Sequence, residues 1–245
     1  MTLVVERPKL EKKIKLGPPI FIINFKLYKQ GIGENALKLA QIIDDIAHDI
    51  KEITFVVAVN FIDLVRIKEN VSKTLVFAQH VDPVEFGAFT GHISPSLLKE
   101  YDIDGTLINH SERKIPEKDI KEAINLCKKY EILQCVCAGS VEEVERLVNF
   151  TPTMLAYEPP ELIGTGIAVS KAQPEILSKA MNIIQTKSGG KVIPLCGAGI
   201  SSAEDAKRAI ELGAKGILVA SAIVKSKTPA EIIEEMAIAM LEGIS

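Results

Sequence analysis

The sequence of 245 residues has no tryptophan, few aromatic residues and only four cysteines. Its cysteines show neither CxxC spacing nor neighbouring histidines, so the pattern indicates neither a zinc site nor a disulfide framework. We expect no metal ion, and we expect the cysteines to be small buried residues. They are Cys127, Cys135, Cys137 and Cys196.

Long hydrophobic runs and an excess of one charge are also missing. No apolar run approaches the roughly 18 residues of a membrane span, and the N-terminal segment mixes Glu6 and Glu11 with several basic residues, unlike a signal peptide. We therefore expect a cytoplasmic protein without a membrane partner. The net charge of -3, spread along the chain, predicts no nucleic-acid partner.

The chain fits one large domain preceded by an extension. Residues 1–17 are charged and weakly patterned, which is typical of disordered segments, and we treat them as an N-terminal extension. Residues 18–245 have regular patterning and 47% of the sequence is hydrophobic, so we expect a single catalytic domain there.

Short apolar, β-branched runs alternate with helical patterns along this domain. The runs do not alternate in polarity, as expected for parallel strands buried on both faces. They cover residues 20–23, 53–59, 75–78, 105–108, 132–137, 153–156, 192–195 and 216–219. Eight such units predict an α/β fold of the (β/α)8 TIM-barrel type, with an outer ring of helices. An open doubly wound sheet is the alternative, but it usually carries a GxGxxG turn after its first strand.

Several helices carry recognisable start signals. Three serine or threonine residues are each followed three positions later by glutamate, the pattern of a capping box, and Pro229 follows one of them at the first helical position. The pairs are Ser140 with Glu143, Ser201 with Glu204, and Thr228 with Glu231.

Polar residues follow the first and fourth runs, at the edge where barrel enzymes act. Asn24 and Lys26 follow the first, and the lysine can supply positive charge to a substrate anion, although a solvated loop lysine is the alternative. His110 lies in the polar cluster that follows the fourth run and can exchange protons near neutral pH, although a structural histidine is equally consistent. We expect Glu112 and Arg113 beside it to form an ion pair that braces the barrel mouth.

After the sixth run, Glu158 precedes two prolines and a glycine-rich segment. Proline fixes φ and glycine permits positive φ, so this loop is typical of a lid that moves between two positions, although an ordinary turn is the alternative. Small residues follow the last two runs, at 196–200 and 220–222, where such barrels commonly bind phosphate; tight packing of strand against helix is the other explanation.

Taken together, five segments resemble the triosephosphate isomerase family. They are NFK at 24–26, NHSER at 109–113, YEPPELIGTG at 157–166, CGAGIS at 196–201 and ASA at 220–222, and the resemblance extends from about residue 20 to the end. It implies interconversion of dihydroxyacetone phosphate and glyceraldehyde 3-phosphate without a cofactor, in glycolysis and gluconeogenesis.

The resemblance also implies roles for individual residues. Glu158 corresponds to the general base, His110 to the electrophile, and Lys26 and Asn24 to the residues that handle substrate charge and orientation. The substrate-binding residues that it implies are Asn24, Phe25, Lys26, Ile163, Gly199, Ala220 and Ser221.

The chain departs from the commoner bacterial and eukaryotic pattern in its lid and in loop seven, where CGAGI replaces YGGS. These departures are similar to the archaeal branch of the family, which tends toward tetramers, whereas other branches are mostly dimers. The loop with Phe86 and Phe89 resembles the family's subunit-interlocking loop, so we expect a homo-oligomer, with a tetramer favoured over a dimer. An exposed loop is the alternative.

Two other functions are the alternatives to an isomerase. Another phosphosugar barrel would share the phosphate loops but has no reason to contain both NHSER and a glutamate before a proline lid. A catalytically silent binding module is opposed by the presence of Asn24, Lys26, His110 and Glu158.

Overall fold

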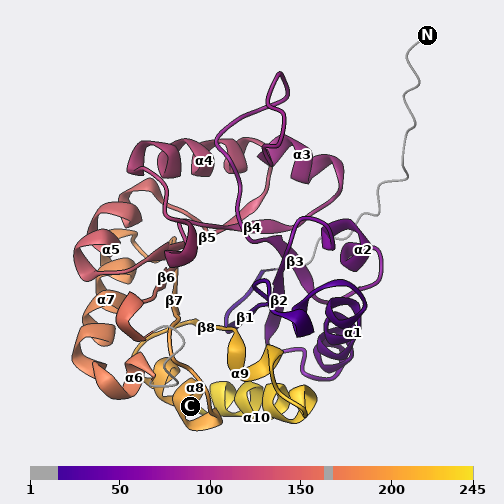
Figure 1. Ribbon diagram of the computed structural model, residues 1–245. Coiled ribbons are helices and arrows are strands. Elements are labelled where there is room, and N and C mark those ends of the chain that lie inside the picture. The colour runs from indigo at the N-terminus through magenta and orange to yellow at the C-terminus, as the bar shows by residue number, and fades with distance from the viewer. Residues whose placement is uncertain (1–15, 163–167, 245) are drawn as a thin grey trace.

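The computed structural model describes residues 16–162 and 168–244, which form a closed barrel of eight parallel strands. Figure 1 looks along the barrel and shows the helices as a ring outside the strands. The strands are β1 (Ile20–Asn24), β2 (Thr54–Val59), β3 (Leu75–Ala78), β4 (Gly105–Ile108), β5 (Leu133–Ala138), β6 (Met154–Tyr157), β7 (Ile193–Cys196) and β8 (Gly216–Val219).

The predicted TIM barrel is confirmed, and each strand begins and ends within one residue of its expected run. Every strand pairs in parallel with its sequence neighbours, and β1 pairs with β8 to close the sheet. This closure brings the carboxyl ends of all eight strands to one rim of the barrel.

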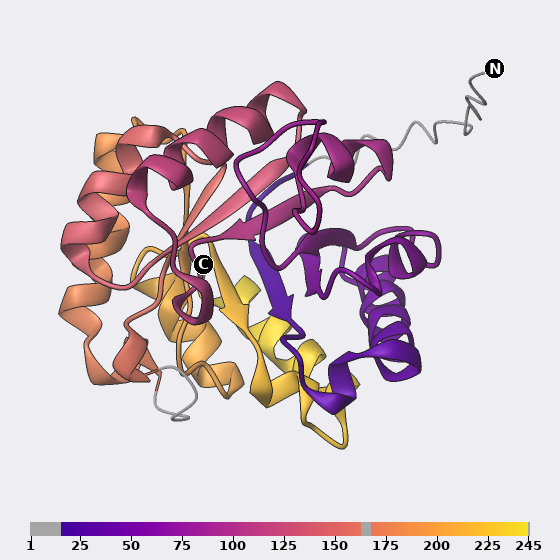
Figure 2. The ribbon, with the colours of Figure 1, turned by 45° about the horizontal axis from the view of Figure 1, so that its top comes forward.

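The helices cover the outside of the sheet, as Figure 2 also shows from a second direction. They are α1 (Gly33–Asp49), α2 (Leu64–Lys68), α3 (Pro95–Glu100), α4 (Glu117–Lys129), α5 (Val141–Leu147), α6 (Val169–Ala172), α7 (Pro174–Lys187), α8 (Ala203–Glu211), α9 (Ser221–Val224) and α10 (Pro229–Glu242). Short 3-10 turns lie at η1 (Lys29–Gly31), η2 (Ser111–Arg113), η3 (Val148–Phe150) and η4 (Pro160–Leu162).

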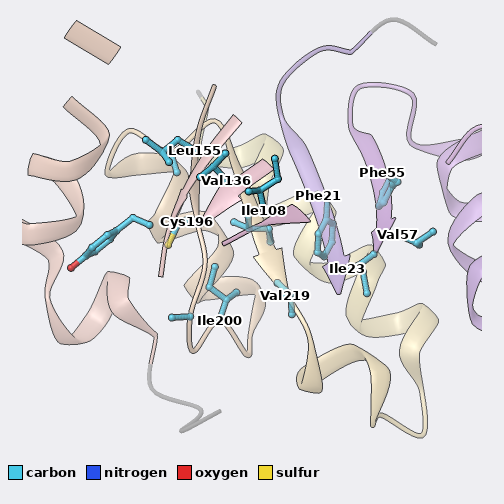
Figure 3. Close-up of a cluster of buried hydrophobic side chains, with 14 of the residues drawn as sticks. Phe21, Ile23, Phe55, Val57, Ile108, Val136, Leu155, Cys196, Ile200 and Val219 are labelled. Carbon is cyan, nitrogen blue, oxygen red and sulfur yellow. The ribbon is translucent and has the colours of Figure 1, made fainter. Parts of the chain in front are cut away.

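Successive side chains of each strand point alternately into and out of the barrel, and both sides of the sheet are covered, so both faces of a strand are mainly apolar. Phe21 and Ile23 of β1 point outward and pack in the larger core beneath the helices, where Figure 3 shows them beside Phe55 and Val57. Ile20 and Ile22 belong to the separate cluster inside the barrel. Two cores therefore meet at one sheet, which explains the uninterrupted apolar runs. All four cysteines are buried and free.

The predicted helix starts are only partly right. Ser140 does cap α5 by accepting from the Glu143 amide, but the Glu143 side chain turns elsewhere, so no reciprocal bond forms.

The other two predicted capping boxes are wrong. Helix α8 begins one residue later than expected, so the box forms between Ser202 and Asp205. Thr228 makes no side-chain cap bond, because its ψ of 62° lies outside the extended region that capping residues normally adopt. Pro229 does occupy the first turn of α10.

The expected N-terminal extension falls mostly outside the described residues. Of its last two residues, Leu16 packs against the cluster inside the barrel, and Gly17 exchanges hydrogen bonds with Thr54 at the start of β2. In the parts of the chain that the structure describes, no helix is both long and apolar enough to cross a membrane.

Candidate active site

The lysine after β1 is held in an uncommon backbone conformation. Lys26 has a φ of 48°, and its amide donates to Oδ1 of Asn24, the last residue of β1, at 3.0 Å. Such left-handed geometry costs about 1–3 kcal/mol outside glycine and persists only where its surroundings enforce it. The Lys26 ammonium lies 2.7 Å from Oε1 of Glu112, and its side chain is only 10% exposed. The lysine is therefore fixed at both ends.

Gln79, directly after β3, is a site residue that the sequence analysis did not identify. Its Nε2 lies within hydrogen-bond distance of the Lys26 carbonyl at 3.1 Å, the Ala58 carbonyl at 3.2 Å and Oδ1 of Asn24 at 3.4 Å. One amide group thus ties together the ends of β1, β2 and β3. The sequence did contain a signal for this residue, because Gln79 is a polar residue directly after the apolar run of β3.

His110 follows β4, and its hydrogen bond defines the form of the ring. Nδ1 accepts from the Glu112 amide at 3.2 Å, so this nitrogen carries no proton and the neutral ring carries its proton on Nε2. The side chain is 7% exposed, and Nε2 lies 3.9 Å from Oε2 of Glu158. A hydrogen-bond donor is therefore directed toward the carboxylate across the barrel mouth.

The predicted ion pair between Glu112 and Arg113 is wrong. Glu112 pairs with Lys26, and Arg113 lies 3.9 Å from Asp82. Because the barrel brings the β1 and β4 ends together, Glu112 reaches a partner far away in the sequence.

Asn109 fixes the backbone turn that precedes His110. It has a φ of 62°, its Nδ2 donates to the Cys137 carbonyl and to Glu143, and its Oδ1 accepts from the Ile115 amide. Burial alone would raise the pKa of Glu143, but hydrogen bonds from Lys114, the Gly139 amide and Asn109 outweigh it and hold that pKa below its usual value. This charged cluster joins the loops after β4 and β5.

Glu158, directly after β6, is a buried carboxylate with one unpaired oxygen. Its side chain is 4% exposed, and Oε2 has no hydrogen-bond partner among the described residues. A β-carbon on Gly197 would lie 2.5 Å from Cγ of Glu158, so only glycine leaves room for the carboxylate. An unpaired buried carboxylate oxygen is costly, and Oε2 remains as an acceptor for a bound substrate.

The thiols near Glu158 stay protonated. A hydrogen bond with Cys135, burial and the charge of Glu158 raise the pKa of Cys137 well above its usual value. Burial and the same charge raise the pKa of Cys196. Neither thiol has the lowered pKa of a nucleophilic cysteine.

Lys26, His110 and Glu158 share one cavity of about 180 Å³, which opens at the carboxyl ends of the strands. Its remaining wall consists mainly of small residues after β7 and β8, including three of the expected phosphate-binding residues, Gly199, Ala220 and Ser221. A neighbouring cavity of about 430 Å³ is lined by Asn24, Lys26 and His110, among others. Among the described residues, no three His, Cys, Asp or Glu side chains are grouped so that they would hold a metal ion.

Two expected substrate-binding residues are not among the described residues that line these cavities. Phe25 is fully buried in the core beneath the helices and lines neither cavity, so only its main chain is left to meet a substrate. Ile163 and the glycine-rich tip of the lid at 163–167 lie outside the described residues.

Comparison with known proteins agrees with this geometry. The family model described as Triosephosphate isomerase matches residues 19–236. The triosephosphate isomerase of Methanobrevibacter smithii is 42% identical, over 90% of this chain and 98% of that protein. Those of Methanocaldococcus jannaschii and Saccharolobus solfataricus are 42% and 38% identical, over 89% and 94% of this chain and 98% and 100% of those proteins. The matches in sequence show that the chain belongs to the triosephosphate isomerase family, and its closed barrel and the residues at its rim agree with that assignment.

Proposed function

We propose that the protein interconverts dihydroxyacetone phosphate and glyceraldehyde 3-phosphate, with Glu158 as the base. The observation that carries this proposal is the unpaired Oε2 of Glu158, 3.9 Å from Nε2 of His110 in a cavity that Lys26 also lines. A glutamate base and a neutral electrophilic histidine are known features of this family.

The reaction moves one proton between neighbouring carbons and a second proton between the oxygens that they carry. Glu158 takes a proton from C1 of dihydroxyacetone phosphate while His110, through Nε2–H, donates a hydrogen bond to the C2 carbonyl oxygen. Glu158 then returns the proton to C2 of the enediolate that forms, while the proton of the C1 hydroxyl passes to the C2 oxygen, so that a carbonyl forms at C1 and a hydroxyl at C2. Because the carbon that is oxidised and the carbon that is reduced belong to one molecule, the step balances without an external oxidant, and we propose that no cofactor takes part.

Lys26 and Asn24 supply charge and orientation in this proposal. Lys26 brings the positive charge that offsets the enediolate and phosphate, and its pairing with Glu112 fixes the ammonium before substrate arrives. Asn24 acts on the lysine through the hydrogen bond to the Lys26 amide.

Phosphate binding is assigned to the wall formed after β7 and β8. Gly199, with a φ of 72°, and the neighbouring Ala220 and Ser221 line the cavity with small side chains, so backbone amides can approach an anion closely. Ile163 completes the set that we propose. A lid that closes there would keep water from the enediolate, a role known for this family's closing loop.

We further propose that the protein is a homo-oligomer, a tetramer rather than a dimer. The connection between β3 and α3 projects beyond the ring of helices (Figure 1) and carries Phe86, 63% exposed, and Phe89, 44% exposed. Leu27, which lines the cavity of about 430 Å³, is 76% exposed, and Ile62, which follows the lining residue Phe61 in the sequence, is 92% exposed. Large exposed apolar side chains of this kind mark association sites, and a projecting loop and a cavity on one chain suit a second copy of that chain.

The reaction belongs to glycolysis and gluconeogenesis, and we propose that it takes place in the cytoplasm. Four free, buried thiols are compatible with a reducing compartment.

The direct test is a coupled assay of glyceraldehyde 3-phosphate turnover by the purified full chain. Turnover well above the uncatalysed rate supports the proposal. A protein that binds phosphosugar without turnover would overturn it in favour of a binding module.

A further inference from the structure

A lysine after β8 lies over an aromatic ring after β1. Nζ of Lys225 is 4.0 Å from the centroid of the Tyr28 ring, well within the distance of a cation–π contact. Tyr28 lines the cavity that contains Glu158 and His110. Lys225 is the residue directly after α9, and its amide donates to the Ser221 carbonyl at 3.1 Å, which closes the single turn of that helix.

A second, independent contact joins the same two segments. Gly31, at the end of η1, packs so closely that a β-carbon there would lie 2.6 Å from the Phe25 carbonyl oxygen and 3.2 Å from the side chain of Val224. The Gly31 amide also donates to the Tyr28 carbonyl at 2.7 Å. The loop after β1 and the helix α9 therefore form one packed junction, seen beside β1 in Figure 1.

We infer that Tyr28 and Lys225 are a positioning pair that holds α9 against the loop after β1 and thereby sets the affinity of the site for phosphate. This inference rests on the proposed function, in which Ala220 and Ser221 meet the phosphate.

The composition of the cavity wall explains why such a pair would matter. Among the described residues that line the cavity, Lys26 is the single lysine or arginine, and its ammonium is already paired with Glu112. The wall formed by Gly199, Ala220, Ser221 and Ala222 has no cationic side chain. Phosphate must then be bound largely by backbone amides, whose contribution depends on their being held in place before the ligand arrives.

The contact between Tyr28 and Lys225 should affect phosphate binding and not the chemical step. The groups that react have partners outside this junction. The Lys26 ammonium pairs with the Glu112 carboxylate, and Nδ1 of His110 accepts from the Glu112 amide. The Glu158 amide donates to the Ala138 carbonyl. Losing the ring contact should loosen α9 and leave the reacting groups in place. The expected result is a higher KM with little change in kcat, the pattern of lost uniform binding.

The probe is inorganic phosphate, titrated calorimetrically at constant ionic strength into the full chain. A cation–π contact at an exposed site corresponds to about a two- to fivefold change in an equilibrium constant. We expect Lys225→Met to raise the Kd for phosphate, and the KM for glyceraldehyde 3-phosphate, by about that factor. Lys225→Arg keeps a cation over the ring and should stay close to the wild-type values.

Lys227→Met is the matched control, because Lys227 is an exposed lysine two positions further along. It removes the same charge without touching the ring, so its Kd should equal that of the wild type. If Lys227→Met weakens phosphate binding as much as Lys225→Met does, a general charge effect explains the result and the positioning pair is overturned.

A double-mutant cycle with Tyr28→Leu tests whether the two residues act together. If they do, Tyr28→Leu combined with Lys225→Met weakens phosphate binding no more than the stronger single change. Effects that multiply in the double variant would overturn the inference. The calorimetric measurement stands apart from the isomerase assay: a wild type that binds phosphate without turnover refutes the proposed function alone, whereas a wild type that binds no phosphate refutes the pair.

Discussion

Oε2 of Glu158 lies 3.9 Å from Nε2 of His110, although the two residues follow different strands, β6 and β4. Both side chains are almost completely buried, and the carboxylate oxygen has no hydrogen-bond partner among the described residues. A proton donor and a proton acceptor thus face one cavity from two sides. A substrate carbonyl and its neighbouring C–H can approach the two groups from the cavity that both line.

Replacing Glu158 should abolish most of the activity. Glu158→Gln keeps the size of the side chain but cannot accept the proton, and Glu158→Asp withdraws the carboxylate. We expect both to lower kcat by at least about 10²-fold, the contribution typical of a positioned base. The coupled assay measures turnover, and calorimetric binding of inorganic phosphate confirms that the site is intact. A Gln variant as active as the wild type would refute the assignment of the base.

Gln79→Met should impair catalysis, although we expect Gln79 to act through Lys26 and not on the reacting atoms. Losing the amide leaves the carbonyls of Lys26 and Ala58 without this donor and removes support from the left-handed backbone of Lys26. An unpaired buried polar group costs about 1–3 kcal/mol, so we expect kcat/KM to fall by roughly tenfold or more.

Gln134→Met is the control for Gln79→Met. Gln134 is also buried and hydrogen-bonded, but it lies near the beginning of β5, where it bonds with Ile132 and Thr153. Its replacement should lower the unfolding midpoint in urea and leave kcat/KM unchanged. If the two variants lose kcat/KM equally, Gln79 has only a structural role.

Gly197→Ala should displace the carboxylate of Glu158. The added β-carbon would lie 2.5 Å from Cγ and 2.6 Å from Oε1 of Glu158, so one of the two groups must move. A displacement of about 1 Å can cost on the order of 10²-fold in rate, and we expect the loss in kcat to exceed any loss in stability. Gly17→Ala serves as control, because nothing lies within 4 Å of its new β-carbon. Wild-type kcat in Gly197→Ala would contradict this account of the site.

The barrel and the meeting of Lys26, His110 and Glu158 at one cavity could be predicted from the sequence, because both depend on local order along the chain. Strands buried on both faces are necessarily continuous apolar runs, and the residues directly after the runs lie at the carboxyl rim of the barrel. His110 and Glu158 stand out for this reason, since a polar residue interrupts an apolar segment abruptly.

The partners of these residues could not be predicted in the same way. Glu112 has an adjacent arginine in the sequence, yet it pairs with Lys26 because barrel closure brings the ends of β1 and β4 together. Gln79 looked like one more loop residue, since its three acceptors come from β1, β2 and the loop after β1. The α8 cap shifted by one residue because Ser201 and Ser202 are both suitable caps, and only the helix start decides between them.

Asp44 should make stability depend on pH. Its carboxylate accepts hydrogen bonds from the amides of Ser72, Lys73 and Thr74, which lead into β3. Burial would raise the pKa of Asp44, but these bonds outweigh it and lower that pKa. A depressed pKa in the folded state stabilises the fold above the unfolded pKa of about 3.9, and this stability is lost as the pH falls through the folded value.

We therefore expect Asp44→Asn to lower the free energy of unfolding by about 1–3 kcal/mol at pH 7, with a difference that shrinks below about pH 4. Urea denaturation across this pH range measures it. Asp45→Asn, at an exposed neighbouring position, should show no such dependence. A difference for Asp44→Asn that stays constant from pH 7 to pH 3 would mean that the carboxylate charge plays no part.

The projecting loop should control association of the subunits. Phe86 is 63% exposed on this loop. The residue before it, Glu85, accepts hydrogen bonds from Lys129 and Tyr130 at the end of α4, which fastens the loop to the ring of helices. An aspartate buried in an apolar contact between copies would be unpaired and costly, so Phe86→Asp should shift the protein toward smaller species in sedimentation velocity. Ile238→Asp changes a side chain of similar exposure, 54%, on α10 and should leave the assembly intact. Because Gly199, Ala220 and Ser221 line the cavity within a single chain, a dissociated Phe86→Asp variant should keep the phosphate site that we propose. If Phe86→Asp sediments as the wild type does at every concentration, the loop does not join the subunits.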